Sequence, residues 1–212
     1  MELERLFYPV QTLGYGKRVG IWLVGCPHRC FNCCNPEIQQ ADKTKQVHIH
    51  QVFQMISSID KQIDGVTISG GDPFFQAEEL AKLVEWLRKS GIDDILIYSG
   101  YTLKQLQKMK NAHVDFVLQN IAVLVDGLYI ENLNDNIPLR GSSNQTVYVL
   151  NEKYQFRYET YFKGERTMQT IVVDNNLISF GIPPKHYKQR LEEKSFEKGL
   201  LLKNNTTSNP KL

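Results

Sequence analysis

The chain has 212 residues, and its 25 lysines and arginines against 23 aspartates and glutamates leave a formal net charge of +2. This near balance, without a long block of like charges, excludes the compositional signature of a nucleic-acid-binding or membrane-surface protein. No run reaches the roughly 18 apolar residues of a membrane span, and the opening MELERLFYPV lacks the apolar core of a signal peptide. We therefore expect a cytoplasmic protein with one sizeable core and with neither nucleic acid nor a membrane as a partner.

All four cysteines, Cys26, Cys30, Cys33 and Cys34, fall within the stretch GCPHRCFNCCNPE. Thiolates suit iron, zinc and copper, and a single cysteine cluster without a secretion signal indicates a metal or redox site and not a disulfide framework. Zinc sites usually pair two C-x2-C knuckles or add histidines to one, but the chain has no second knuckle. Cys26, Cys30 and Cys33 form C-x3-C-x2-C, one thiolate fewer than a closed four-cysteine cluster uses. The metal that they bind would keep an open position.

Taken in chain order, residues 1–17 are expected to be irregular, because Gly14 and Gly16 interrupt any pattern. The sequence then predicts a buried strand at 19–24, a helix at 48–60, a strand at 66–69, a helix at 76–90, a strand at 95–98, a short helix at 103–109, and extended segments at 115–118 and 122–125. Strands alternating with helices indicate an α/β fold with a parallel sheet and right-handed crossovers. Too few βα units precede residue 145 for a full eight-unit barrel.

The ends of the predicted strands carry the polar and glycine-rich motifs. One strand runs into the cysteines, the next into Ser69-Gly70-Gly71-Asp72-Pro73, and later ones into SGYT (99–102) and Asp126-Gly127. Parallel sheets gather functional residues at the carboxyl ends of their strands. Gly-Gly after a strand is most often only a tight turn. Two residues without side chains also let a ligand approach the backbone closely, and Asp72 places a carboxylate beside them.

The pattern changes after about residue 151. Strand-like alternation marks YQFRYETY at 154–161 and TMQTIVV at 167–173. Asp174-Asn175-Asn176, followed by an apolar stretch at 177–180, indicates a hairpin turn. A charged, helix-like segment follows to about residue 202.

This change divides the chain into three predicted parts: a core over 1–150, a β-rich extension over 151–202 and a flexible tail over 203–212. The alternation within the extension predicts that one of its faces is solvated or open to a partner, and Arg157 and Arg166 are expected there. The hairpin is expected either to recognise a partner by strand addition or to cap an open sheet edge.

The residues around the cysteines, G-C-P-H-R-C-x-x-C-x-N, make the chain resemble the radical S-adenosylmethionine (SAM) enzymes, and more closely the activating enzymes of anaerobic ribonucleotide reductase. Asn32 agrees with that family, which normally has no aromatic residue just before its third cysteine. Four further blocks resemble those activases in the same order, namely SGGDPFFQ (69–76), YSGYT (98–102), VLVDGLYI (123–130) and LRGSSNQ (139–145). The resemblance covers residues 1 to about 150. It implies a partial (β/α) barrel of the radical SAM type, with residues 1–17 along its mouth. The C-terminal β-hairpin extension, which the residue pattern predicts, is absent from the short activases.

The resemblance also implies the cofactors and their contacts. A [4Fe-4S] cluster would be held by Cys26, Cys30 and Cys33, and its fourth iron would bind SAM. The amino group of SAM would lie against Gly70, Gly71 and Asp72. Its adenine would lie beside the backbone of Asn32, Cys33 and Cys34.

Two further residues of the cysteine loop are expected to act differently. Cys34 lies one position beyond the ligand spacing, so it is expected to pack as a small side chain and not to bind iron. His28 lies between two of the ligands. It is expected either to tune the cluster through a hydrogen bond or to face solvent.

As a whole, the resemblance implies an oxidoreductase that cleaves SAM reductively to a 5′-deoxyadenosyl radical and generates a glycyl radical on a partner protein. Anaerobic ribonucleotide reductase is the candidate partner, and a flavodoxin or ferredoxin is the candidate one-electron donor. Two alternatives stay open. One is a radical SAM enzyme that modifies a small molecule or peptide, with the C-terminal segment as a lid; the other is a non-catalytic metal-binding protein with a regulatory role.

Overall fold

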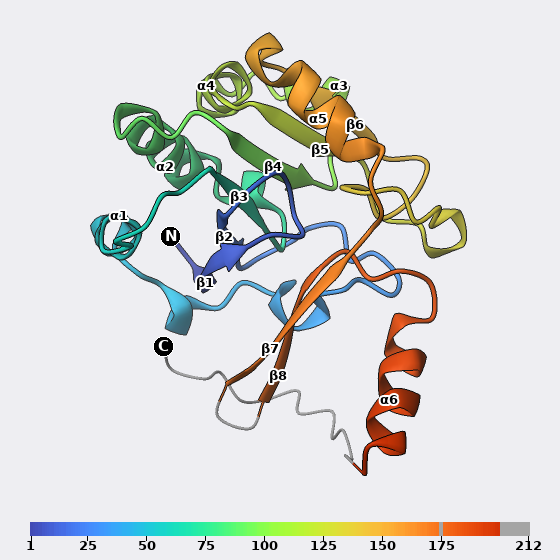
Figure 1. Ribbon diagram of the computed structural model, residues 1–212. Helices are drawn as coiled ribbons and strands as arrows, with labels where there is room; N and C mark the ends of the chain where they lie inside the picture. The colour runs from blue at the N-terminus through green and yellow to red at the C-terminus, as the bar shows by residue number, and fades with distance from the viewer. Residues whose placement is uncertain (174–175, 200–212) are drawn as a thin grey trace.

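A six-stranded sheet forms the centre of the computed structural model, which describes residues 1–173 and 176–199 (Figure 1). Four neighbouring strands run parallel, namely β2 (Arg18–Leu23), β3 (Gly65–Gly70), β4 (Ile95–Ser99) and β5 (Val123–Asp126). Two edge strands, β1 (Leu3–Val10) and β6 (Thr146–Val149), pair antiparallel with β2 and β5. The predicted α/β fold and its four central strands are therefore confirmed, whereas both edge strands lie where the sequence predicts none.

Strand β1 replaces the irregular segment expected at residues 1–17. Its register with β2 shifts twice, so its side chains do not alternate regularly between the two faces, and the sequence pattern of a strand is lost. Gly14 and Gly16 lie in the connection to β2 with φ angles of +127° and +78°. Residues with side chains rarely adopt such angles. The two glycines thus turn the chain between paired strands.

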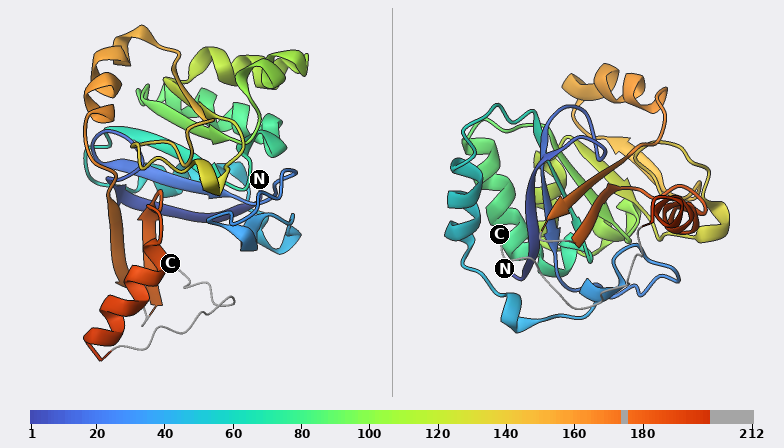
Figure 2. Two further views of the ribbon diagram at one scale, coloured as in Figure 1. Left: turned by 90° about the vertical axis from the view of Figure 1, so that its right-hand side faces the viewer. Right: turned by 60° about the horizontal axis from the view of Figure 1, so that its bottom comes forward.

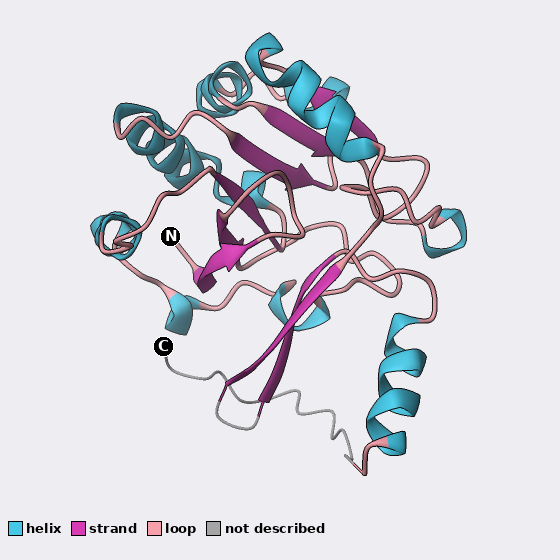
Figure 3. Ribbon diagram, viewed as in Figure 1, coloured by secondary structure: helices cyan, strands magenta, loops and turns pink. Residues whose placement is uncertain are grey.

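One face of the sheet is covered by four helices, α1 (Ile49–Ser57), α2 (Ala77–Lys89), α3 (Leu103–Lys108) and α4 (Ala112–Asn120) (Figure 3). Alternate strand residues, such as Val19, Ile21 and Leu23 of β2, point into this layer and are completely buried. Because a strand alternates its side chains between faces, every second residue of the parallel strands belongs to this core. The helices cover the face of the sheet, and the connecting loops lie at the ends of the strands.

Helix α4 lies where the sequence predicts an extended segment at 115–118. Asn111 caps the helix, because its side-chain oxygen accepts from the backbone N–H groups of His113 and Val114. Val114 and Val117, three positions apart, are both buried on one helix face. Periodicity alone cannot distinguish a short apolar run in a strand from one in a buried helix, and here the cap decides.

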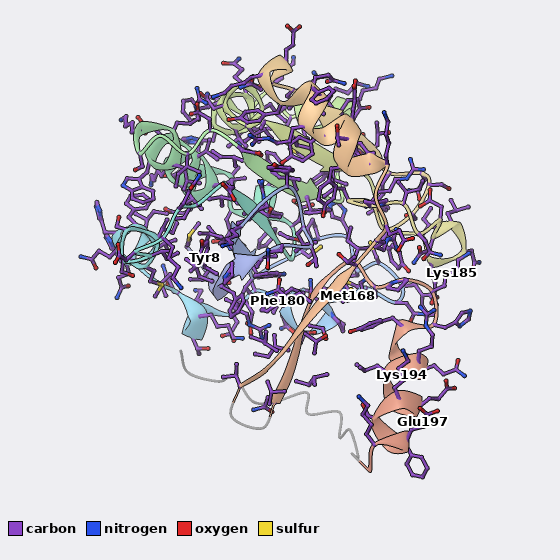
Figure 4. The ribbon with its side chains drawn as sticks, in the orientation of Figure 1. Tyr8, Met168, Phe180, Lys185, Lys194 and Glu197 are labelled. Atoms are coloured by element: carbon purple, nitrogen blue, oxygen red, sulfur yellow. The ribbon has the colours of Figure 1, made fainter. Side chains whose placement is uncertain are left out.

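The opposite face of the sheet is covered by C-terminal elements. Helix α5 (Gln155–Phe162) packs its Tyr158 against Leu96 of β4 and against β5. The strands β7 (Met168–Val173) and β8 (Asn176–Gly181) meet the sheet at Phe180, which is labelled in Figure 4. The Phe180 ring stacks on Phe7 with 4.4 Å between centroids and lies 5.2 Å from the Trp22 ring. Residues after 150 thus complete the hydrophobic core on this second face of the sheet.

Helix α5 corrects the strand that the sequence predicts at residues 154–161. Tyr154 and Tyr158 lie four positions apart, so that one helical face buries both. The same stretch also alternates aromatic and polar residues with the period of a strand. Phe156 fits only that second pattern, and its side chain is 81% exposed. Burial of the two tyrosines against the sheet therefore selects the helix.

Strands β7 and β8 pair antiparallel at the positions where the sequence predicts strands; residues 174–175 between them lie outside the described residues. The pair and the helix α6 (Tyr187–Glu197) extend away from the two layers of the core (Figure 2). The predicted tail over 203–212 also lies outside the described residues. Within the described ranges, no helix is both long and apolar enough to cross a bilayer.

Short 3₁₀ helices lie in the connections. They are η1 (Pro36–Ile38), η2 (Lys43–Lys45), η3 (Pro73–Gln76), η4 (Glu131–Leu133) and η5 (Glu152–Tyr154). Of these, η1, η3 and η4 follow β2, β3 and β5, at the carboxyl end of the parallel strands. The predicted cofactor residues lie at this same end.

Candidate cluster and cofactor site

The cysteine loop begins where β2 ends, and its base is closed by two backbone hydrogen bonds. Gly25 N donates to Ile38 O at 2.8 Å, and Cys26 N donates to Gln39 O at 2.7 Å. Ile38 is almost fully buried and anchors the returning end of the loop. The three predicted iron ligands therefore lie on one loop whose two ends are fixed to each other.

The thiols of Cys26, Cys30 and Cys33 are free and half-buried, and that of Cys34 is free in an exposed residue. Burial raises the pKa of Cys26 and of Cys30. The neighbouring Cys34 thiol lowers the pKa of Cys33 to about 6, because it donates a hydrogen bond to the Cys33 sulfur, and the same bond raises the pKa of Cys34. The Asn35 N–H also lies 3.4 Å from the Cys33 sulfur. Cys33 is thus the thiol most readily present as a thiolate ligand.

These thiols fit an iron-sulfur cluster in their chemistry and placement. In the described part of the chain, no three Cys, His, Asp or Glu side chains converge closely enough to hold a single metal ion. A four-iron cluster held by three cysteines takes one thiolate on each of three irons, so convergence on one point is not required. The three half-buried thiols on this closed loop provide one thiolate for each of the three irons.

The loop also contacts the segment that follows β5. Asn32 has a left-handed φ of +51° and its side-chain amide donates to the Glu131 carboxylate in η4. The backbone N–H of Tyr129 lies at the Cys30 thiol, where it offsets part of the rise in pKa caused by burial. The predicted adenine contact Asn32 is therefore already connected to η4 through its side chain.

Gly70 and Gly71 allow the turn after β3 to lie against the start of the cysteine loop. Gly71 N donates to Leu23 O and Asp72 N to Gly25 O, both at 2.8 Å. A Cβ atom on Gly70 would lie 2.3 Å from Leu23 O, and one on Gly71 would lie 2.1 Å from Gly25 O. No side chain fits at either position. The glycines are thus required by the approach of two loops, and their contact with SAM stays a prediction.

Asp72 lies at the centre of the site and is completely buried. Its carboxylate accepts from Phe74 N at 3.0 Å, from Gly100 N at 2.8 Å and from the Ser99 hydroxyl at 3.0 and 3.2 Å. The His28 ring nitrogen Nε2 lies 2.9 Å from the Asp72 oxygen Oδ2. His28 therefore points inward from the cysteine loop and not to solvent; its hydrogen bond goes to Asp72, and a tuning effect on the cluster stays a prediction. Distances of 27, 28 and 44 residues along the chain hide these partners from the sequence.

The other predicted blocks meet at the same end of the sheet. Asp126 accepts from Leu103 N, at the start of α3, and from Thr146 N in β6. Gln145 accepts from Gly141 N and donates to Gly127 O, so LRGSSNQ forms a compact turn over the end of β5. The ordered sequence blocks are thus loops that surround one site.

Arg166 and Arg157 do not lie on an exposed face of the hairpin. The Arg166 side chain is 4% exposed and donates to Asn134, Ile137, Arg140 and Pro183. Arg157 belongs to α5 and donates to the buried Asp94 at 2.8 Å. No sequence signal marks these contacts. Three of the five partner groups are backbone carbonyls, which every residue has, and a fourth is a carboxylate far away in the sequence.

Comparison with known proteins shows the family of the chain. A family model described as a 4Fe-4S single cluster domain matches residues 12–148. The anaerobic ribonucleoside-triphosphate reductase-activating protein of Enterobacteria phage T4 is 30% identical over 153 residues, which cover 70% of this chain and 94% of the relative. Its counterpart in Haemophilus influenzae is 30% identical over 150 residues, covering 67% of this chain and 94% of the relative.

Two further similarities are weaker. The pyruvate formate-lyase-activating enzyme of Staphylococcus aureus is 27% identical over 154 residues, covering 68% of this chain and 61% of the relative. The crystal structure of QueE from Escherichia coli aligns with 47% of this chain and 52% of its own at a TM-score of 0.41 and 21% identity. From the family model and the two reductase-activating relatives, the chain belongs to the radical SAM activating proteins that carry a 4Fe-4S single cluster domain.

Proposed function

We propose that this protein generates a glycyl radical on a partner protein, with anaerobic ribonucleotide reductase as the partner. One observation carries the proposal: three half-buried thiols lie on a closed loop at the carboxyl end of a parallel sheet, in a chain of this family. When bound, a reduced [4Fe-4S] cluster and SAM supply reductive cleavage of SAM to methionine and a 5′-deoxyadenosyl radical. A flavodoxin or ferredoxin is proposed as the electron donor.

The residues of this chain hold and orient those groups. Cys26, Cys30 and Cys33 are the proposed cluster ligands. The proposed SAM contacts remain Asn32, Cys33, Cys34, Gly70, Gly71 and Asp72. For Asp72, its backbone is the group available to a ligand, because its carboxylate is buried among internal donors. We also propose that the sheet is the wall of a partial barrel of the radical SAM type, with residues 1–150 as the catalytic core.

The surface around the cysteine loop supports a protein as the substrate. Phe31 on the loop is 81% exposed, and Phe75 of η3 beside Gly25 is half exposed. The segment after β5 adds four exposed apolar side chains, Leu128, Ile130, Leu133 and Ile137. Exposed apolar side chains gathered around a site mark an interaction with another macromolecule. A 5′-deoxyadenosyl radical formed by cleavage of SAM at this site would reach a protein only if that protein docks on this surface.

The alternative of a small-molecule enzyme with the C-terminal segment as a lid is less well supported. The base of the hairpin packs through Phe180 on Phe7 and Trp22, which lie on the face of the sheet. Tyr154 of η5 and Tyr158 of α5 cover the same face at β4 and β5. The C-terminal elements therefore have a packing role that does not need a ligand.

A reconstitution experiment tests the proposal and separates it from both alternatives. Anaerobic loading with iron and sulfide, followed by dithionite and SAM, should yield 5′-deoxyadenosine and bound iron and sulfide. With anaerobic ribonucleotide reductase present, electron paramagnetic resonance should show the doublet of a glycyl radical. SAM cleavage without a glycyl radical would favour a different substrate, and cluster binding without SAM cleavage would favour a regulatory protein.

A further inference from the structure

The Asp72 carboxylate has no acceptor capacity left for a ligand. An ionised carboxylate offers about four hydrogen-bonding positions. Phe74 N and the Ser99 hydroxyl lie at Oδ1, while Gly100 N, the same hydroxyl and His28 Nε2 lie at Oδ2. A buried carboxylate must keep such donors, because losing one leaves a charged atom unsatisfied. The carboxylate is therefore fully used inside the protein and is not free for the SAM ammonium.

The donors come from three different loops. His28 belongs to the cysteine loop after β2, Phe74 to the turn after β3, and Ser99 and Gly100 to the end of β4. One carboxylate thus connects the ends of three neighbouring parallel strands. No other side chain between Cys26 and Cys30 has a polar contact with the sheet among the described residues.

The surroundings of His28 are shaped to its ring. The edge of the ring contacts Tyr101, with 4.3 Å between centroids and 74° between planes. Gly100 leaves the space that the ring fills, since a Cβ atom there would lie 2.4 Å from His28 Cδ2. The next residue, Arg29, has a left-handed φ of +50° and turns the chain back toward Cys30. The ring therefore lies between Tyr101 and Gly100, and the backbone turns immediately after it at Arg29.

We propose that Asp72 and His28 are positioning residues that hold the Cys26–Cys30 arm of the loop in its cluster-binding form before the cluster is bound. This inference deepens the proposed function and rests on it for its purpose. A rigid cluster needs three thiolates in fixed places, and a loop ordered in advance avoids the entropy cost of ordering at the moment of binding. Asp72 acts through His28 and does not touch the cluster or SAM with its carboxylate.

The first test uses the cluster-free protein under reducing conditions. His28→Phe keeps the ring against Tyr101 but removes the donor to Asp72. Amide hydrogen exchange of residues 26–35 should become faster by about tenfold, the effect of losing one charge-assisted hydrogen bond. His28→Gln, which keeps an N–H donor, should recover part of the protection. The exposed His113→Phe is the matched control and should leave this exchange unchanged.

The second test separates a positioning role of Asp72 from direct binding of SAM by its carboxylate. In the reconstituted protein, His28→Phe and Asp72→Asn should both release iron to a chelator several times faster than wild type. If Asp72 binds the SAM ammonium instead, Asp72→Asn will weaken SAM binding alone and loop exchange will stay at wild-type rates in both variants. That result, or unchanged exchange in a folded His28→Phe protein, overturns the inference.

The two proposals fail separately. The exchange experiment needs neither SAM nor a partner, so an absence of SAM cleavage in wild type would remove the proposed function and leave the loop measurement standing. Asp72 is buried, and its replacement by Asn is expected to lower stability. His28 lies on a surface loop, so His28→Phe provides the result if Asp72→Asn does not fold.

Discussion

Two buried aspartates lie at opposite ends of the same parallel strands, and different groups compensate their carboxylates. Asp94, just before β4, accepts from Arg18, from Arg157 and from the Tyr158 hydroxyl. Asp72, just after β3, accepts from backbone N–H groups, a serine hydroxyl and one histidine. The amino end of the sheet is thus fixed by two cations. At the carboxyl end, Asp72 is held by donors on loops, and no lysine or arginine contacts its carboxylate among the described residues.

The difference shows how one sheet separates stability from chemistry. Arg18 is completely buried and also donates to Thr67 and to backbone carbonyls, so the amino end is a closed network. Arg157 and Tyr158 come from α5, which ties the C-terminal elements into this network. At the carboxyl end, the thiols and several apolar side chains remain partly exposed. Changes at the two ends should therefore have separable effects.

The largest effect is expected for the three cysteines at the carboxyl end. Alanine at Cys26, Cys30 or Cys33 should abolish SAM cleavage and prevent loading of a stable cluster, because two thiolates do not hold it. Cys34→Ala is the control and should keep both. Iron and sulfide analysis with 5′-deoxyadenosine assays measures the outcome. Loss of the cluster in Cys34→Ala together with its retention in Cys33→Ala would contradict the ligand assignment.

The next effect is expected at the amino end and concerns stability. Asp94→Ala leaves Arg18 buried without its carboxylate, which should lower the free energy of unfolding by about 3–5 kcal/mol. The adjacent Asp93→Ala removes only surface pairs with Arg88 and Lys153 and should cost less than about 1 kcal/mol. Urea unfolding of the cluster-free protein measures both. Equal losses would show that the buried network does not stabilise this end.

The sequence predicts the central strands because each is a short, buried, apolar run between turn residues. It fails at β1, where two register shifts remove the alternation, and at α5, where tyrosines four apart also fit a strand. In both cases contacts with distant residues decide the structure. The local pattern is compatible with more than one answer.

The candidate site shows the same limit. The cysteine spacing is local, so the family and the predicted ligands follow from the sequence. The partners of Asp72 are not local, since His28 lies 44 residues away and Gly100 lies 28 residues away. The sequence leaves the Gly-Gly pair either as a tight turn or as a close approach to a ligand, whereas the structure shows that the backbone of Gly25 already requires glycine at position 71. Contacts between loops from different strands have no signature in a single sequence.

Gly71 offers a third test, in which a moderate effect is expected on both stability and cluster loading. A methyl group at Gly71 would lie 2.1 Å from Gly25 O, so Gly71→Ala should lower stability by about 1–3 kcal/mol and also reduce cluster loading. The control is Gly91→Ala, at the far end of α2, where nothing lies within 4 Å and only the positive φ causes strain. Thermal unfolding and iron content measure the two effects. Reduced SAM affinity with unchanged stability and iron content would support the turn as a pure SAM contact.

The smallest expected effect is a titration confined to the cysteine loop. The pKa of Cys33 is lowered to about 6 from an ordinary value of 9.0, chiefly by the hydrogen bond from Cys34. Because the pKa in the folded protein is the lower one, this bond stabilises the fold most above the unfolded pKa, and the contribution is lost as the pH falls through about 6.

Alkylation by iodoacetamide follows the thiolate, so it reports this titration directly. In the reduced, cluster-free protein at pH 7, Cys33 should react before Cys26 and Cys30, whose pKa values are raised by burial. Its rate should fall as the pH is lowered through about 6. Cys34→Ser keeps a donor and should preserve the midpoint, whereas Cys34→Ala should move it toward 9.0. Mass spectrometry of the labelled peptide measures each rate. A midpoint that stays near 6 in Cys34→Ala would assign the shift to the Asn35 N–H and the Gln39 side chain instead, and would show that this ligand is prepared without Cys34.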